Sequence, residues 1–199
     1  MSNRATKSFS LPLAVPLTAV LTLGLAATTA SCGPPDMIRT PAAGLPRWEG
    51  RAVELFDDNI DPDAVGLTME GLSPRSDIHL RARAQTADVV ARLRVNTVTV
   101  DSVGDRQTYH IGVQVGVPTL TDAKLPDRSF ELSVKSTSAA FGIVRSFDSR
   151  LKGHTFVGFI KRYTNDDGDS LIHWHLSADT AEVAAAVKEA VVLREISGS

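Results

Sequence analysis

Two neighbouring segments, in which apolar and polar side chains alternate, constrain the fold of this 199-residue chain more than any other feature. Such a period of two is typical of β-strands with one buried face. The β-branched run 97–100 extends the first segment and the polar residues 104–107 turn the chain, so the two segments predict an antiparallel hairpin. The apolar positions are Val89, Ala91, Leu93 and Val95 in the first segment and Tyr109, Ile111, Val113, Val115 and Val117 in the second.

Further strands are predicted on both sides of this hairpin. Residues 130–134 alternate in the same way and predict a third strand of a meander. Residues 155–163 and 171–176 predict a second hairpin around the polar loop 165–169. We also expect a short strand over Ala52–Phe56 at the start of the folded part.

Helical spacing predicts the remaining elements. Ser73 before Pro74 predicts a helix start, with the helix continuing to about Ala84, although the apolar residues there also alternate as in a strand. In this helix Arg75, Arg81 and Arg83 would be solvated. Apolar residues on one face predict a helix over 140–151, followed by Gly153 at its carboxyl end. Asp179 and Glu182 predict a capping box for a last helix. Its buried positions would be Val183, Val187 and Val191.

Taken together, these segments predict the fold class α+β. We expect an antiparallel sheet of about five to six strands, with two to three helices packed on one face. The predicted organisation is a signal peptide over residues 1–31, a Pro/Gly-rich tether over residues 32–46 and a single α+β domain over residues 47–199.

The first 31 residues have the layout of an export signal. Arg4 and Lys7 provide a positive start, and residues 11–30 contain no charged side chain. A short apolar segment that ends in small residues is typical of a cleaved secretory signal. The alternative is an uncleaved membrane anchor, which normally needs about 20 predominantly apolar residues.

The tract from Ala27 to Cys32 resembles the lipobox of bacterial lipoproteins, with Thr29 standing where that family usually has an aliphatic residue. The resemblance implies that Cys32 receives a diacylglycerol and that the chain is cut just before it. Cys32 is the only cysteine of the chain, whereas disulfides in exported proteins come in pairs. The alternative is an ordinary cleaved signal with an incidental free cysteine. Gly33, where enteric inner-membrane members of the family have aspartate, implies the outer membrane.

Charge excludes one class of partner. Without Arg4 and Lys7, the formal net charge changes from −2 for the whole chain to −4, and no tract is rich in lysine or arginine. Nucleic acid is therefore not an expected partner. The expected partners are the membrane, through lipidated Cys32, and either an envelope protein or a small apolar ligand.

The pair His173 and His175 is the candidate metal site. Residues two apart on a strand project from the same face, as paired zinc ligands sometimes do, and Trp174 would then point into the core. Zinc needs a third and usually a fourth ligand, which His154 or His110 would supply only if the fold brings them close. The alternative is a solvated strand face, so we expect no resident cofactor.

Two acidic segments offer further candidates. Residues 165–169 carry oxygen ligands for calcium but lack the spacing of an EF-hand, and a hairpin turn accounts for the same composition. A carboxylate cluster precedes the first predicted helix and suits either acid/base chemistry or an exposed loop. The cluster comprises Glu54, Asp57, Asp58, Asp61 and Asp63.

Two functions remain. The first is a lipid-anchored bacterial cell-envelope protein, with its domain in the periplasm, that binds a partner or takes part in envelope assembly without catalysis. The alternative is a metal-dependent envelope hydrolase that uses His173 and His175. The chain contains no Gly-x-Ser-x-Gly motif, phosphate-binding loop or dinucleotide fingerprint, so it offers no motif for the common enzyme classes.

Overall fold

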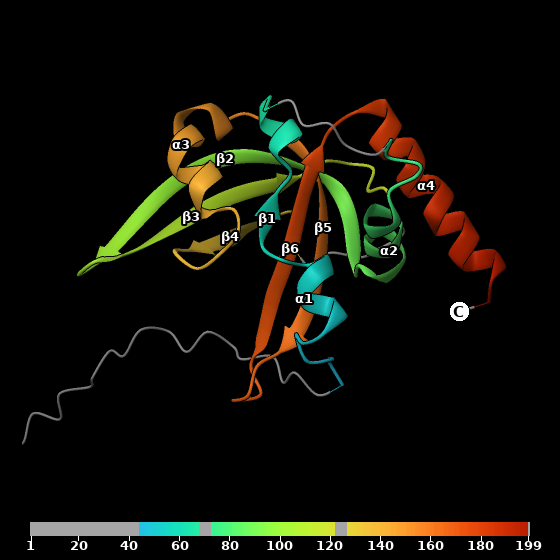
Figure 1. The fold of residues 1–199 in the computed structure, drawn as a ribbon, viewed down its shortest axis with the longest axis horizontal. Coiled ribbons are helices and arrows are strands. Elements are labelled where there is room, and N and C mark those ends of the chain that lie inside the picture. The colour runs from blue at the N-terminus through green and yellow to red at the C-terminus, as the bar shows by residue number, and fades with distance from the viewer. Residues whose placement is uncertain (1–43, 68–72, 122–126, 199) are drawn as a thin grey trace, which may run out of the picture. The chain divides into compact units, whose positions relative to one another are not determined.

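The computed structural model describes residues 44–67, 73–121 and 127–198 (Figure 1). Cys32, the predicted signal peptide and most of the tether therefore lie outside the described residues. The elements are α1 (Arg51–Leu55), β1 (Asn59–Ile60), the 3-10 helix η1 (Pro62–Val65), α2 (Ile78–Thr86), β2 (Val89–Val103), β3 (Arg106–Val115), β4 (Ser129–Lys135), α3 (Phe141–Leu151), β5 (Thr155–Thr164), β6 (Ser170–Ala178) and α4 (Ala181–Ile196).

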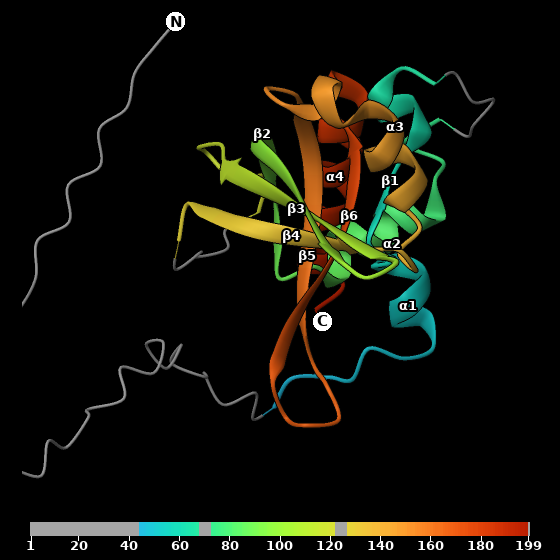
Figure 2. The same cartoon turned by 90° about the vertical axis from the view of Figure 1, so that its left-hand side faces the viewer.

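One six-stranded sheet, with the order β1-β6-β5-β2-β3-β4, organises the domain. All neighbouring strands are antiparallel except β1, which runs parallel to β6. The predicted hairpins are confirmed as β2–β3 and β5–β6, and β4 completes the predicted meander. Figure 2 shows β2, β3 and β4 nearest the viewer, with α4 beyond β5. The α+β class and the mainly antiparallel sheet are as predicted.

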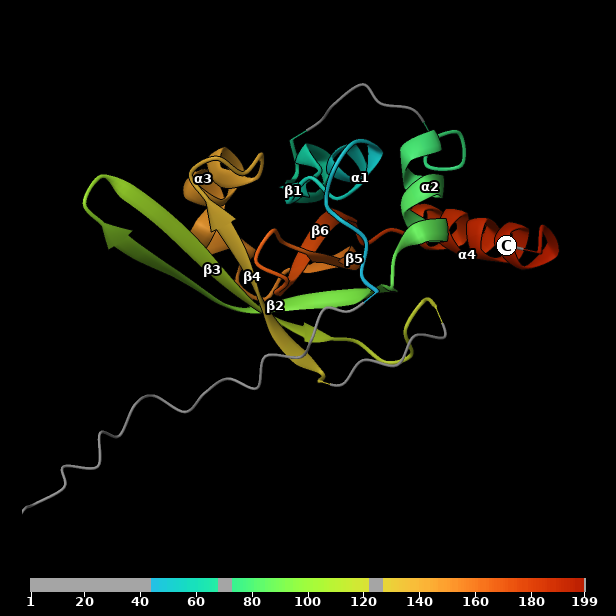
Figure 3. The same ribbon diagram turned by 90° about the horizontal axis from the view of Figure 1, so that it is seen from below.

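The strand β5 is buried on both faces and separates two apolar clusters. Phe156 and Ile160 belong to the cluster that contains residues of α3, η1 and the β2–β4 meander. Val157 and Phe159, at the intervening positions, pack with residues of α1, α2 and α4. Figure 3 shows the resulting arrangement, with α3 and α4 at opposite ends of the curled sheet. Three helices, α1, α2 and α4, thus pack on one face, as predicted, whereas α3 packs on the other, because alternate side chains of β5 need a cover on each side.

Three local predictions differ from the structure at the starts of helices. Residues 51–55 form the single-turn helix α1, where a strand over Ala52–Phe56 was predicted, and Gly50 before it has a positive φ of 57°. The helix α2 begins at Ile78, because the Asp77 carboxylate accepts hydrogen bonds from the amides of His79 and Leu80 at 2.7 and 3.2 Å. These bonds satisfy amide groups that lack a partner within the helix.

The last helix begins one residue later than predicted. Thr180, not Asp179, is the N-cap of α4, and its hydroxyl accepts from the amide of Val183 at 3.1 Å. Asp179 instead forms an ion pair with Arg92 at 2.8 Å. The predicted apolar face is confirmed at Val183 and Val187, which are buried, whereas Val191 is only partly buried.

Candidate functional site

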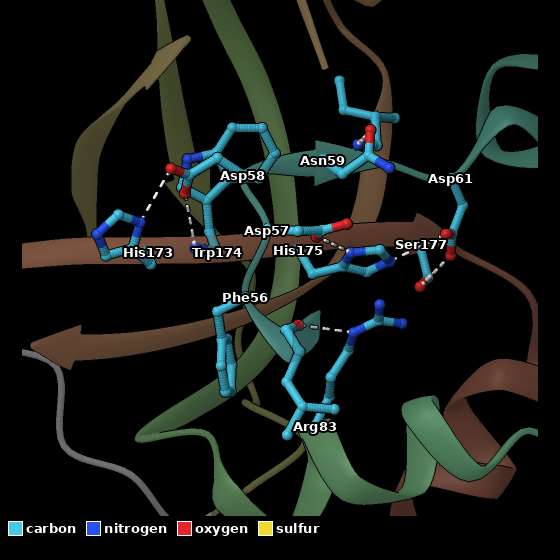
Figure 4. Close-up of polar contacts among 12 residues, drawn as sticks. Phe56, Asp57, Asp58, Asn59, Asp61, Arg83, His173, Trp174, His175 and Ser177 are labelled. Atoms are coloured by element: carbon cyan, nitrogen blue, oxygen red, sulfur yellow. Dashed lines mark hydrogen bonds and ion pairs between the residues drawn. The ribbon is translucent and has the colours of Figure 1, made fainter. Parts of the chain in front are cut away.

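The candidate site lies where the loop between α1 and η1 runs along β6. The two residues of β1 pair in parallel with β6, so that Asn59 lies opposite His175 and Ile60 opposite Leu176. Residues on both sides of β1 therefore reach the face of β6 that carries His173 and His175. The structure thus brings together two groups that the sequence offered separately, the histidine pair and the carboxylate cluster (Figure 4).

His175 lies between two carboxylates. Its Nδ1 is 2.7 Å from Asp57 Oδ1, its Nε2 is 2.9 Å from Asp61 Oδ1, and its side chain is 2% exposed. Because ionised carboxylates only accept hydrogen bonds, both ring nitrogens donate, and the imidazole is the protonated cation. Burial by itself lowers the pKa of His175, but the hydrogen bonds to Asp57 and Asp61 outweigh it and raise the pKa.

Asp61 is held by three groups of the same network. Burial favours its neutral form, yet the hydrogen bond and positive charge of His175, a hydrogen bond from Ser177 and the charge of Arg83 lower the pKa of Asp61. The Ser177 hydroxyl donates to Asp61 Oδ2 at 2.5 Å. Asp61 thus stays ionised opposite the cationic imidazole.

Arg83 is a member of this network that the sequence interpretation missed. It was predicted to be solvated but is 7% exposed, and its Nε donates to the carbonyl oxygen of Leu55 at 2.7 Å. Burial lowers the pKa of Arg83, and the nearby Asp61 and Asp57 charges oppose that effect. The available signal was the helical spacing, because position 83 lies one turn from the buried Leu80 and Ala87. The positive charges of Arg83 and His175 therefore balance the negative charges of Asp57 and Asp61.

His173 forms a second, smaller contact with the same loop. Its Nδ1 is 2.9 Å from Asp58 Oδ2, and its ring stacks on Trp48 at 3.7 Å between centroids with an interplanar angle of 7°. Asp58 also binds the backbone of Trp174, accepting from its amide at 3.1 Å and donating its own amide to the carbonyl oxygen at 2.9 Å. These contacts fasten the loop to β6.

The predicted solvated face is therefore wrong for the histidine pair, whereas the inward orientation of Trp174 is as predicted. His173 and His175 are 9% and 2% exposed, because Trp48 stacks on His173 and the aspartates on both sides of β1 contact the two rings. Trp174, 1% exposed, points into the opposite apolar cluster. We call Asp57, Asp58, Asp61, His173, His175 and Ser177 the histidine–aspartate clasp, because they join the loop to the strand.

The clasp does not have the geometry of a nucleophile with a general base. That chemistry needs the serine hydroxyl within hydrogen-bond distance of an imidazole nitrogen. Here the Ser177 hydroxyl bonds to Asp61, and both nitrogens of His175 already bond to carboxylates. Among the described residues, no three His, Cys, Asp or Glu side chains form a group that could hold a metal ion.

The other candidate residues lie outside the clasp. His110 pairs with Glu131 and Asp101 on the meander, and His154 packs against Phe156. Glu54 and Asp63 are exposed, and within the described ranges neither has a hydrogen bond to the clasp histidines.

The loop 165–169 has the hydrogen bonds of a turn. Asn165 Oδ1 accepts from the Asp169 amide at 2.7 Å, and Gly168 has a φ of 82°. The side-chain oxygen of Asn165, a candidate calcium ligand, therefore takes part in a hydrogen bond of the predicted turn.

Comparison with known proteins provides no further assignment. The chain matches no family model, no curated protein and no solved structure. In the part of the chain that the structure describes, no helix is both long and apolar enough to cross a membrane. Its function is therefore inferred from the sequence and from the geometry of the clasp.

Proposed function

We propose that this chain is a lipid-anchored protein of the bacterial cell envelope that works by binding, not by catalysis. The location in the cell envelope is supported by the uncharged apolar segment that ends in small residues directly before Cys32. Lipidation at Cys32 would hold the protein at the membrane, with the outer membrane preferred and the domain in the periplasm. Its partner would be another envelope protein or a small apolar molecule.

The observation that carries the non-catalytic role is the use of the histidines in the clasp. His175 has both ring nitrogens bonded to carboxylates, and His173 has Nδ1 bonded to Asp58 and one ring face covered by Trp48. A general base or a metal ligand needs a nitrogen lone pair that is free to take a proton or an ion. His175, which the alternative hydrolase would need, has no such lone pair, and both histidines hold a loop against β6.

Mass spectrometry of the native amino terminus tests the lipid anchor. We expect a mature chain that begins at Cys32 and carries acyl groups, because the family processing implied by the resemblance acts on that cysteine. Cys32→Ala should abolish acylation and leave either the uncut precursor or a form cut at a general signal site. Thr29→Leu, which brings the segment closer to the family pattern, is the matched control and should be processed normally. An unmodified thiol at Cys32, or a mature chain that begins elsewhere, would refute the lipoprotein assignment.

Elemental analysis of the purified protein separates the binding role from the alternative hydrolase. We expect no stoichiometric transition metal and an unfolding midpoint that chelator leaves unchanged, since both ring nitrogens of His175 are already bonded to carboxylates. Stoichiometric zinc that is lost in a His173→Ala variant would instead support the metal-dependent hydrolase. Capture of membrane proteins through a tagged full chain would then identify the partner.

A further inference from the structure

The carboxyl end of α4 carries an exposed apolar ridge. Val192, Leu193 and Ile196 are 51%, 39% and 77% exposed. At 3.6 residues per turn these three positions lie close together, on the side of the helix that faces away from the core. Lys188 and Glu189, one turn earlier on this side, are exposed and carry opposite charges. Figure 3 shows this end of α4 at one extreme of the domain and the tip of the β2–β3 hairpin at the other.

Basic side chains lie near this ridge, at an open cavity of about 760 Å³ where α2 and α4 end. Lys161 Nζ donates to the carbonyl oxygen of Thr86 at 2.5 Å, and Arg194 Nη1 donates to that of Gln85 at 3.1 Å. Because carbonyl oxygens carry no net charge, these two bonds hold both cations at the cavity without neutralising them. The cavity is lined by Gln85, Thr86, Lys161, Arg194, Glu195 and Ser197.

Positive charge exceeds negative charge around this cavity. The cations Lys161, Arg162 and Arg194 lie here with only two carboxylates, those of Asp88 and Glu195. Asp88 is 3.8 Å from Lys161 and 3.3 Å from Arg162, so one carboxylate is shared by two cations. The chain as a whole, by contrast, has a formal net charge of −2. A basic excess beside exposed apolar side chains is the combination that binds the interface of an anionic membrane.

The proposed lipid anchor decides what this surface meets first. Twelve peptide units connect Cys32 to Gly44, the first described residue, and even fully extended they span only about 40 Å. An anchored domain therefore stays close to the lipid headgroups. There the effective concentration is high enough for a weak second contact to form.

We propose that the carboxyl end of α4 is a second membrane contact, specific for anionic phospholipids. Val192, Leu193 and Ile196 enter the headgroup region, and Lys161 and Arg194 face the lipid phosphates. This inference deepens the proposed function and rests on it, because it takes the lipid anchor as given. The contact holds the end of α4 at the membrane and turns the tip of the β2–β3 hairpin, at the opposite extreme of the domain, towards the periplasm.

Fluorescence quenching in vesicles tests the contact on the acylated full chain. Cys32 is the only cysteine, and acylation would occupy its thiol, so an engineered cysteine takes a nitrobenzoxadiazole label selectively. The vesicles contain phosphatidylglycerol and phosphatidylcholine, with nitroxide groups on some acyl chains. The label on Val192→Cys should be quenched about twofold, because the ridge enters the lipid. Val103→Cys is the matched control, since Val103 is 80% exposed at the tip of the β2–β3 hairpin and its label should not be quenched.

Two further changes separate the electrostatic part of the contact from the apolar part. Vesicles of phosphatidylcholine alone, or high salt, should remove most of the quenching, because the attraction between the cations and the lipid phosphates is then absent or screened. Ile196→Asp should lower the quenching of the label at position 192 to that of the label at position 103, since a carboxylate is costly to place in an apolar environment. Val103→Asp, the same change at the other extreme of the domain, should leave the quenching unchanged.

Mass spectrometry of the same samples reads the acylation, so the anchor and the second contact are tested separately. Acylated protein in which the labels at positions 192 and 103 are quenched equally would overturn the second contact alone. Equal quenching with and without phosphatidylglycerol would overturn its specificity for anionic lipid. A label at position 192 that is shielded only when native membrane proteins are present would assign the ridge to a protein partner instead. A chain without acyl groups would overturn the anchor and this inference with it.

Discussion

Replacing His175 with leucine is expected to lower the free energy of unfolding by about 3 kcal/mol. The variant removes the cation between Asp57 and Asp61 and leaves both carboxylates without their histidine partner. Removing one partner of a buried ion pair costs about 3–5 kcal/mol. We expect the lower end, because the Asp57 and Asp61 side chains are 28% and 34% exposed, so water partly replaces the lost contacts. Urea unfolding followed by circular dichroism measures the loss.

His110→Leu is a matched control for this variant. His110 also lies between two carboxylates, at 3.2 Å from Asp101 and 2.6 Å from Glu131. Those side chains are 74% and 57% exposed, so the pairing is largely screened by solvent and is worth about 1 kcal/mol or less. If both histidine variants lose the same stability, burial of the clasp is not what gives His175 its effect.

The clasp also predicts how stability changes with pH. The pKa of His175 is raised above its ordinary value of 6.5, so its contribution is complete below pH 6.5 and is lost as the pH rises through the folded-state pKa. The pKa of Asp61 is lowered below its ordinary value of 3.8, so its contribution is present above pH 3.8 and is lost as the pH falls through the folded-state pKa. The two contributions overlap between these ordinary values.

Urea unfolding across a pH series checks this dependence. The wild type should lose stability above pH 6.5, and His175→Leu should lack that alkaline loss. An identical decline in both proteins would show that another group controls the alkaline side.

The second large effect is expected for Val187→Asp on α4. Val187 is 0% exposed and packs in the cluster that contains Val157 and Phe159. A carboxylate there would be buried in an apolar environment, at a cost of several kcal/mol. Because a domain of this kind is stable by about 5–15 kcal/mol in total, we expect the variant to be largely unfolded or to melt far below the wild type.

Val192→Asp introduces the same charge on the same helix as a control. Val192 is 51% exposed, so its carboxylate remains hydrated and the stability should change by about 0.5 kcal/mol or less. Thermal unfolding of the two variants and the wild type makes the comparison. A Val187→Asp variant that melts within a degree or two of the wild type would contradict the docking of α4 on the core.

Periodic patterns in the sequence determined most of the elements by themselves. Each long strand buries one face over several residues, and each amphipathic helix buries one stripe, so the repeating positions reveal both the type of element and its buried side. The alternation of 89–95 and 109–115 predicted the β2–β3 hairpin. The spacing of Val183 and Val187 likewise predicted the buried face of α4. The candidate lipidation residue Cys32 also rests on sequence, since it lies outside the described residues.

Only the tertiary structure decided what covers the polar face of β6. The strand β1 has two residues, too few for any period, and its pairing with β6 joins positions more than 100 residues apart. A local pattern shows only that His173 and His175 are polar, so it predicts that their side chains face solvent. It carries no information about the carboxylates that a loop distant in sequence places beside them. For Arg83, helical spacing could mark the buried side of α2, but it could not show the charges of Asp57 and Asp61 that lie near the guanidinium in the fold. A buried charge is stable only where an opposite charge lies close to it, and only the tertiary structure brings these charges together.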